Sequence, residues 1–259
     1  MTLPKSPCGA ETSASDTGAI PPGPVLSTSP IAYPKRKDPM SRYTHSASWY
    51  DALSAEPIYG VGRARAIPAL HLREGSRVLD IGCGTGLNFP LLLAAVGRSG
   101  QAVGVDRSRA MLEVARRKTI QAPPGNVALV EADAEQLDHV AVGLDGPGAP
   151  FDAVLFTYSL SLMSGWEAAW LRATSLVRPG GRAAIVDMGL PHGWARLLDP
   201  AARLACLLAG ADINARPWTL LERTAHNVQS WSLLGGHVQV RVGTLGSAAQ
   251  IGDRLGHAA

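Results

Sequence analysis

The feature that most constrains this chain is a short apolar run that ends in regularly spaced glycines. The run Arg77–Ile81 has the composition of a parallel strand that is buried on both faces. Glycine then stands at every second position, at Gly82, Gly84 and Gly86, and a helical pattern begins at Leu87. Glycine allows positive φ angles and leaves the backbone open to a close ligand. A turn between a strand and a helix N-terminus is where α/β proteins bind ligands, so the sequence predicts a site here.

Further strands and helices alternate after this turn. The patterns predict strands at 101–105, 127–130, 151–156 and 182–187, and helices at 57–70, 87–96, 109–118, 135–140, 166–177, 194–208 and 218–226. Two extended runs, 229–234 and 237–245, flank Gly235-Gly236 and predict a β-hairpin. We therefore expect an α/β fold with a doubly wound, mostly parallel seven-stranded sheet that ends in an antiparallel hairpin.

The composition divides the chain into three parts. Residues 1–40 are rich in Pro, Gly, Ser and Thr and are expected to form a disordered tail, with Met40 as the hypothetical natural start. Residues 41–250 are expected to form one folded domain, and residues 251–259 a flexible C-terminus.

Charge and cysteine content limit the classes of partner. The net charge of +3 is small and dispersed, which argues against a nucleic-acid partner. The three cysteines, at positions 8, 83 and 206, are far apart and form neither a metal motif nor a disulfide framework. With no spanning apolar run and no signal-peptide pattern, we expect a cytoplasmic protein, with peripheral contact to a membrane surface left open.

Carboxylates follow the predicted strands where parallel strands end. Asp80, Asp106, Asp133 and the stretch Phe156–Ser159 all fall at this carboxyl edge, which forms the ligand crevice of an open α/β sheet. Asp106 follows the glycine turn by about twenty residues, at the position where a carboxylate accepts hydrogen bonds from both hydroxyls of a ribose. The ligand is therefore predicted to contain a nucleoside.

The identity of the nucleoside depends on two positions. A dinucleotide fingerprint needs a glycine where this chain has Leu87, and Asp80 repels a pyrophosphate but suits an ammonium group. S-adenosylmethionine combines a ribose with an ammonium and a sulfonium, so it fits better than NAD. An NAD-dependent oxidoreductase stays as a disfavoured alternative.

Three segments resemble motifs of one enzyme family. Val78–Gly86 resembles the first motif of the class I S-adenosylmethionine-dependent methyltransferases, and Val103–Asp106 and Leu176–Arg182 resemble later motifs of the same family. The resemblance covers residues 43–245 and implies a Rossmann-like methyltransferase domain with S-adenosylmethionine as its cofactor.

The resemblance also implies roles for individual residues. Gly82, Gly84 and Gly86 would border the methionine part of the cofactor, with Asp80 near its amino group. Asp106 would hold the ribose, and Asp133 the adenine amine, although Asp106 also suits a helix cap and Asp133 a solvated loop. The remaining expected contacts are Arg107, whose guanidinium would stack on the adenine, and Cys83, Ala134 and Phe156, of which Cys83 also suits a small filler.

The acceptor side is defined by candidates on three loops. Tyr50, with Trp49, is expected to cover the cofactor, and an acceptor is expected to arrive at Tyr158 and Ser159. If the acceptor is a hydroxyl, it needs a general base, for which His192 or Asp187 is the candidate.

The segment Thr157–Met163 with Trp166, together with Tyr50-Asp51 and Asn88, resembles bacterial N-methyltransferases of lipid amines. We therefore expect methyl transfer to an amine on a small-molecule or lipid acceptor. One alternative is C- or O-methylation of a quinone or phenolic metabolite, although the Arg-Asn pair that the ubiquinone/menaquinone enzymes carry after strand four is missing here. A non-catalytic S-adenosylmethionine-binding protein is the alternative of another class.

Overall fold

The computed structural model describes residues 56–123, 125–142, 150–193, 199–200, 203, 212 and 214–256, with the side chains of residues 56–58 left out. The predicted tail, Met40, the candidates Trp49, Tyr50 and Asp51, and nearly all of the predicted helix 194–208 lie outside the described residues.

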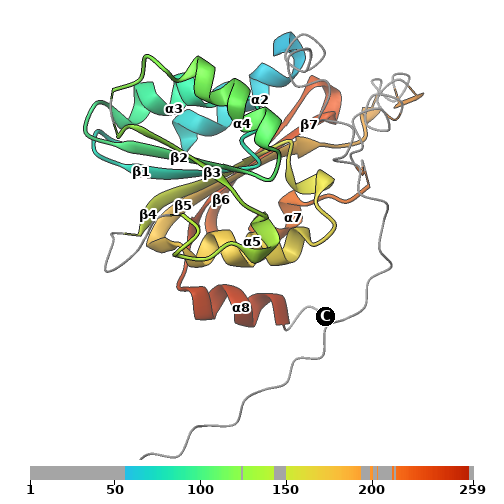
Figure 1. Cartoon of the computed structure of the whole chain (residues 1–259). Helices are drawn as coiled ribbons and strands as arrows, with labels where there is room; N and C mark the ends of the chain where they lie inside the picture. Colours follow the sequence, from blue (N-terminus) through green and yellow to red (C-terminus); the bar gives the residue numbers. More distant parts are fainter. Residues whose placement is uncertain are drawn as a thin grey trace, which may run out of the picture. The chain divides into compact units, whose positions relative to one another are not determined.

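A seven-stranded sheet forms the centre of the described domain (Figure 1). Its spatial order is β3-β2-β1-β4-β5-β7-β6. The first five strands are parallel, and β7 runs antiparallel to both β5 and β6. This confirms the predicted fold class. The strands are β1 Arg77–Ile81, β2 Gln101–Asp106, β3 Val127–Glu131, β4 Phe151–Thr157, β5 Val177–Met188, β6 Ala225–Leu233 and β7 Val238–Leu245.

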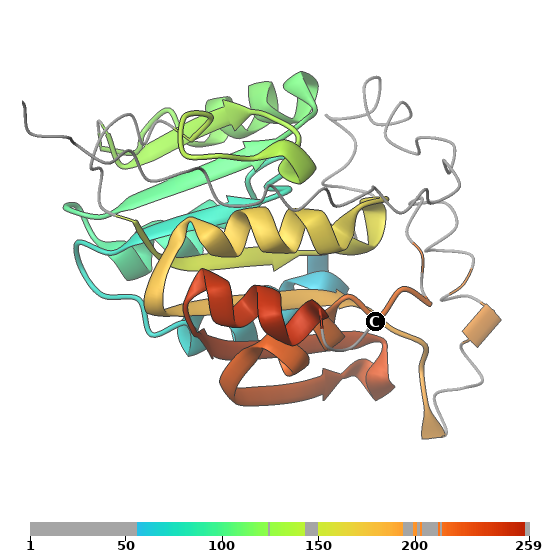
Figure 2. The same ribbon diagram turned by 90° about the horizontal axis from the view of Figure 1, so that it is seen from below.

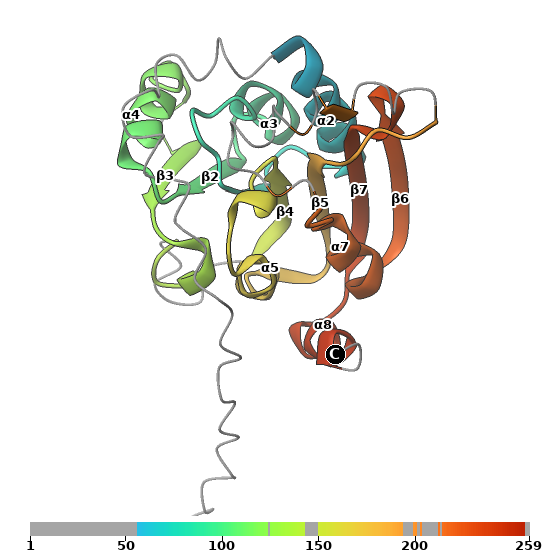
Figure 3. The same ribbon diagram turned by 90° about the vertical axis from the view of Figure 1, so that its right-hand side faces the viewer.

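Helices cover both faces of this sheet. Figure 3 shows α2 (Glu56–Ala69), α3 (Phe89–Val96) and α4 (Arg109–Lys118) on one face. The view from below in Figure 2 shows the other face, which is covered by helices from later in the chain. These are α5 (Trp166–Ser175), α7 (Trp218–Thr224) and α8 (Ala248–Gly256). Short 3₁₀ turns complete the described elements: η2 Ala134–Gln136, η3 Leu160–Leu162 and η5 Leu234–Gly236.

Alternation within the strands explains the two layers. Val78 packs into the core under α2 and α3, whereas its neighbour Leu79 packs into the opposite core with Trp170 of α5. Ser108 caps α4 through a hydrogen bond from the Met111 amide, at 3.4 Å. None of the helices in the described part of the chain is both long and apolar enough to span a bilayer.

The structure corrects several predicted boundaries, among them the helix predicted at 218–226, which ends at Thr224 because residues 225 and 226 belong to β6. The expected helix at 135–140 is only the short turn η2. Strand β5 begins at Val177 rather than Arg182, because Val177 pairs with Phe151 before the register shifts. Residues 248–256, part of which was expected to be flexible, form α8, because Ile251 and Leu255 lie one helical turn apart and pack against the core.

Candidate active site

The three glycines of the turn after β1 all have positive φ, but they face different surroundings. A Cβ atom at Gly82 would lie 2.4 Å from the Cβ of Ser159, and one at Gly86 would lie 2.7 Å from Cδ2 of Phe89. A Cβ at Gly84 would meet no atom within 4 Å. Gly82 and Gly86 are therefore required by packing, whereas Gly84 borders open space where a ligand can approach the backbone.

Asp106 ties this turn to the end of β2. Its Oδ2 accepts a hydrogen bond from the Gly84 amide at 2.8 Å, and its Oδ1 accepts one from the Ser108 amide at 2.8 Å. Burial raises the pKa of Asp106, and the two amide hydrogen bonds oppose that shift. Each carboxylate oxygen has a second lone pair, so the group can accept two further hydroxyl donors. The helix-cap and ribose-binding interpretations are thus compatible.

Asp80 lies one layer beneath the turn and has no exposed surface. Asn88 Nδ2 donates to both of its oxygens, at 2.9 and 3.0 Å, and to Thr157 Oγ1 at 2.8 Å. Burial is the main cause that raises the pKa of Asp80 to about 7, while the Asn88 amide and the Arg63 cation lower it. Within the described residues, the buried Oδ1 of Asn88 has no hydrogen-bond partner. Burial outweighs the Asn88 and Arg63 contributions to the pKa of Asp80, so a ligand cation close to the carboxylate would stabilise its charged form.

The other predicted cofactor contacts divide into two groups. Asp133 is half-buried and caps η2 by accepting a hydrogen bond from the Glu135 amide at 2.9 Å, with Ala134 buried beside it. Arg107 is exposed at the start of α4, next to Asp106. These three lie along the ends of β2 and β3, where the adenine was predicted.

Phe156 and Cys83 both have buried side chains. The Phe156 side chain is fully buried against Trp170, with the ring centroids 5.8 Å apart, which is the position of a core residue, and its contact with the cofactor stays a prediction. Cys83 packs beside Gly104, and burial together with the charges of Asp80 and Asp106 holds its thiol pKa well above the usual range. It is a small filler with no thiolate character.

Tyr158 and Ser159, the predicted acceptor residues, both form hydrogen bonds to backbone carbonyls of neighbouring elements. Ser159 is buried and donates to the Ile81 carbonyl at 2.8 Å, which links the ends of β4 and β1. Tyr158 has a φ of 54°, and its hydroxyl donates to the Tyr59 carbonyl at 2.7 Å. A non-glycine residue held in this conformation at a strand end is a common mark of a functional site.

A group that sequence reasoning missed lies next to Tyr158. The ring of Tyr59, on α2, packs on Tyr158 with centroids 5.0 Å apart, and its hydroxyl lies 3.3 Å from His237 Nε2. His237 Nδ1 lies 3.1 Å from the Gly189 carbonyl oxygen, which can only accept. In the neutral ring Nδ1 therefore carries the proton, and Nε2 is left as a proton acceptor. The sequence signal was weak, because Tyr59 and His237 are 178 residues apart.

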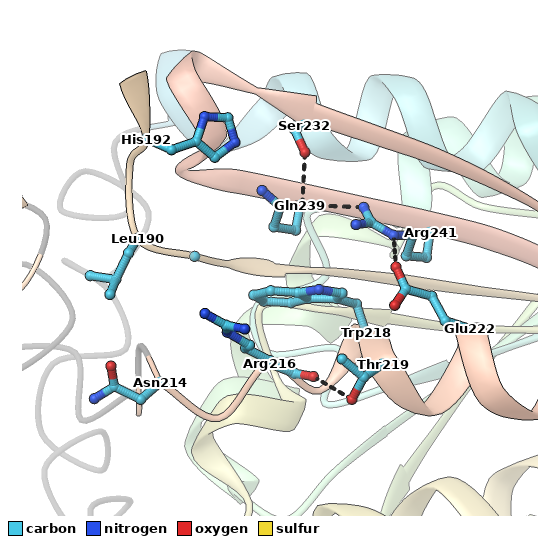
Figure 4. Close-up of a pocket in the computed structure, with 11 residues that line it drawn as sticks. Leu190, His192, Asn214, Arg216, Trp218, Thr219, Glu222, Ser232, Gln239 and Arg241 are labelled. Carbon is cyan, nitrogen blue, oxygen red and sulfur yellow. Dashed lines mark hydrogen bonds and ion pairs between the residues drawn. The ribbon is translucent and has the colours of Figure 1, made fainter. Parts of the chain in front are cut away.

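Neither candidate base from the sequence lies in that position. Asp187 is fully buried, and its oxygens accept hydrogen bonds from the Ser161 amide, the Ser161 hydroxyl and the Met188 amide. Burial raises the pKa of Asp187 to about 6. Its oxygens are engaged by Ser161 and Met188 in the protein interior and do not face a ligand site. His192 is exposed, packs on Gly236 and lines a cavity of about 640 Å³ beyond β5 (Figure 4). Asp187 is thus a structural residue, and His192 belongs to a separate cavity.

The described residues fit S-adenosylmethionine. Gly84 leaves a cradle that a Cβ would enter, Asp106 keeps acceptor capacity for a ribose, and Asp80 supplies negative charge under an ammonium. In this arrangement Asp80 acts through charge from below rather than by direct contact.

Comparisons with known proteins agree with this geometry. Residues 78–181 match a family model described as a methyltransferase domain. The 2-phytyl-1,4-naphtoquinone methyltransferase of Synechococcus elongatus is 34% identical over 146 residues, which cover 55% of this chain and 60% of that relative. The aklanonic acid methyltransferase of a Streptomyces species is 30% identical over 168 residues, which cover 64% of this chain and 71% of that relative.

The chain belongs to the class I S-adenosylmethionine-dependent methyltransferases. Its cofactor is S-adenosylmethionine, as predicted from the sequence. Among solved structures, phosphoethanolamine N-methyltransferase 2 of Haemonchus contortus has a TM-score of 0.60 at 14% identity, covering 81% of this chain and 59% of that one, which is a likeness of fold. Within this methyltransferase, the family model spans the glycine turn, Asp106 and β4, and it ends before the cavity beyond β5.

Proposed function

We propose that this methyltransferase transfers a methyl group to a carbon or oxygen atom of a quinone-type or phenolic small molecule. The sequence favoured an amine acceptor, whereas the quinone-directed name of the Synechococcus relative supports the alternative. Since the matched region covers 60% of that relative, the acceptor rests mainly on the site itself.

The observation that carries the proposal is the orientation of His237. A phenol or quinol must lose a proton when it is methylated, and it reacts best with a proton acceptor in reach. His237 Nε2 is held as an acceptor by the bond from Nδ1 to the Gly189 carbonyl, and Tyr59 Oη lies against it. The Tyr59–His237 pair can therefore take the acceptor's proton, with Tyr59 passing it on to Nε2.

The transfer is an in-line displacement. Bound S-adenosylmethionine supplies a sulfonium methyl group, whose S–CH₃ bond breaks as the new C–CH₃ or O–CH₃ bond forms, with the bonding electron pair staying on sulfur. The described residues position the two reactants: Gly84 and Asp106 hold the donor, and Tyr158 shapes the wall between donor and acceptor.

Methyl transfer from S-adenosylmethionine with a tritiated methyl group tests the proposal. The full chain is incubated with naphthoquinols, substituted phenols and a lipid-amine extract in parallel. We expect label in the quinol or phenol products. Label in lipid amines alone would overturn the acceptor class, and the absence of transfer by a chain that binds S-adenosylhomocysteine would favour the non-catalytic alternative.

A further inference from the structure

The cavity beyond β5 has a floor and walls built from four separate parts of the chain. Gly189, Leu190 and His192 follow β5, Asn214 and Arg216 precede α7, Trp218, Thr219 and Glu222 belong to α7, and Ser232, Gln239 and Arg241 belong to the hairpin. Figure 4 shows the flat Trp218 ring between these parts, with the Arg216 guanidinium beside it on the side of Leu190. Trp218 is 8% exposed, so its ring is firmly packed and only a small part of it borders the cavity.

The polar groups on one wall satisfy one another. Gln239 Oε1 accepts from Ser232 Oγ at 2.9 Å and from Arg241 Nη1 at 3.2 Å, and Arg241 also pairs with Glu222. The charge of Arg241 is thereby balanced. The polar groups of this wall are held by one another and offer no unpaired charge to a ligand.

Arg216 differs from that wall. Its φ is 48°, and its carbonyl is held by the Thr219 amide at 3.1 Å and the Thr219 hydroxyl at 2.9 Å. Within the part of the chain that the structure describes, no hydrogen bond or ion pair joins its guanidinium to another residue. A strained backbone that holds an uncompensated cation beside an aromatic ring points to recognition of an acidic group.

The cavity lies on the same edge of the sheet as the glycine turn. Gly82 directly follows β1 and Gly189 directly follows β5, with only the parallel strand β4 between them. Two strand spacings correspond to about 10 Å across the sheet, and Gly189 lies three residues, roughly 10 Å, further along its strand direction than the position level with Gly82. Gly189 lines the cavity, and its carbonyl is also the group that orients His237. An extended ligand that occupied both the donor crevice and the cavity would run past His237.

We propose that this cavity holds the acidic far end of an extended aromatic methyl acceptor, whose carboxylate pairs with Arg216 and whose ring packs against the exposed part of Trp218. This inference rests on the proposed function for the methylated end. It adds that the acceptor spans at least two fused or linked rings and carries an acid at the end opposite the methylated atom.

Titration calorimetry of the full chain, saturated with S-adenosylhomocysteine, tests the cavity with 4′-hydroxybiphenyl-4-carboxylate. We expect Arg216→Gln to weaken binding of this acid at least tenfold, since a charge-assisted bidentate pair is lost. The neutral analogue 4-phenylphenol should bind wild type and Arg216→Gln equally. Arg223→Gln removes an exposed arginine of α7 that does not line the cavity, and should change nothing. Equal affinity of wild type and Arg216→Gln for the acid would overturn the proposal.

Transfer of a tritiated methyl group separates this inference from the proposed function. The two-ring acid should be methylated, and 4-hydroxybenzoate should compete with it without being methylated, because one ring is too short. If quinols are methylated but the two-ring acid binds through Arg216 without being methylated, the cavity does not hold the acceptor. If Arg216-dependent binding persists while no phenol or quinol is methylated, the proposed function fails instead.

Discussion

The glycine turn after β1 and the cavity beyond β5 lie on the same edge of the sheet, but they are built in different ways. The turn uses backbone amides and glycine conformations within residues 82–88, together with the carboxylate of Asp106. The cavity uses side chains from a loop, a helix and two strands that are far apart in the sequence. A site formed by the backbone of one short segment produces a motif that can be recognised in the sequence. A site formed by side chains from distant segments produces no such motif.

Substitution within the turn should have the largest effect and should separate packing from ligand contact. Gly82→Ala places a methyl group 2.4 Å from Ser159 Cβ at positive φ, and should lower the free energy of unfolding by about 2–4 kcal/mol. Gly84→Ala meets no protein atom, and should cost only about 1 kcal/mol for its positive φ. Urea unfolding measures both.

For the folded fraction of each variant, affinity for S-adenosylhomocysteine should fall more in Gly84→Ala than in Gly82→Ala, which is the reverse of the order for stability. The methyl group of Gly84→Ala enters the cradle, so affinity for S-adenosylhomocysteine should fall tenfold or more. An equal loss of stability in the two variants, with unchanged affinity in Gly84→Ala, would show that the open space at Gly84 is not the donor crevice.

Removal of the proposed proton acceptor should affect catalysis rather than donor binding. His237→Gln should lower kcat by about 100-fold, the usual contribution of general base catalysis, with little change in affinity for S-adenosylhomocysteine. With a phenol that is already ionised in solution as the substrate, kcat of His237→Gln should fall much less. His226→Gln, which alters an exposed histidine of β6, serves as the matched control. If kcat of His237→Gln falls equally with ionised and un-ionised phenols as substrates, His237 has only a structural role.

The carboxylate at the end of β2 can be compared with one at the opposite edge. Asp106→Ala should weaken S-adenosylhomocysteine binding by about 1–3 kcal/mol through lost charged hydrogen bonds. Asp152→Ala removes a carboxylate at the start of β4, where Asp152 accepts from the Arg77 amide at 2.8 Å. It should lower stability without changing affinity. Similar affinity losses in both variants would refute the ribose assignment.

The conformation of the turn on the donor side could be predicted from the sequence because each signal there is local. The positive φ of Gly82, Gly84 and Gly86 and the Ser108 cap follow from neighbouring residues. The packing of Phe156 on Trp170 could not be predicted, because alternation along β4 gave no indication of which face α5 would cover.

On the acceptor side, the partners of His237 could not be found from spacing, since Tyr59 reaches it from the first described helix. His192 was a reasonable candidate by position, but the hairpin places Gly236 against its ring.

The smallest expected effect concerns the pH dependence of stability. Asp80 is charged above about pH 4 in the unfolded chain but only near pH 7 in the folded one, so stability is lost as pH rises between these values. Asp80→Asn should remove this loss and raise the unfolding free energy by on the order of 1–2 kcal/mol at pH 8 but hardly at pH 4. Asp187, whose pKa is raised to about 6, should keep part of the decline in the variant. A gain of equal size at both pH values would contradict the burial of an uncompensated Asp80 charge.

Hydrogen–deuterium exchange of the full chain with S-adenosylhomocysteine tests most directly whether the donor binds at the glycine turn after β1 rather than at the cavity beyond β5. We expect slowed exchange in peptides covering residues 82–88 and 106–112, with residues 235–241 unchanged until the two-ring acid is added. Protection by S-adenosylhomocysteine that appears only around residues 189–192 and 235–241, and not at the glycine turn, would contradict the assignment of the donor crevice.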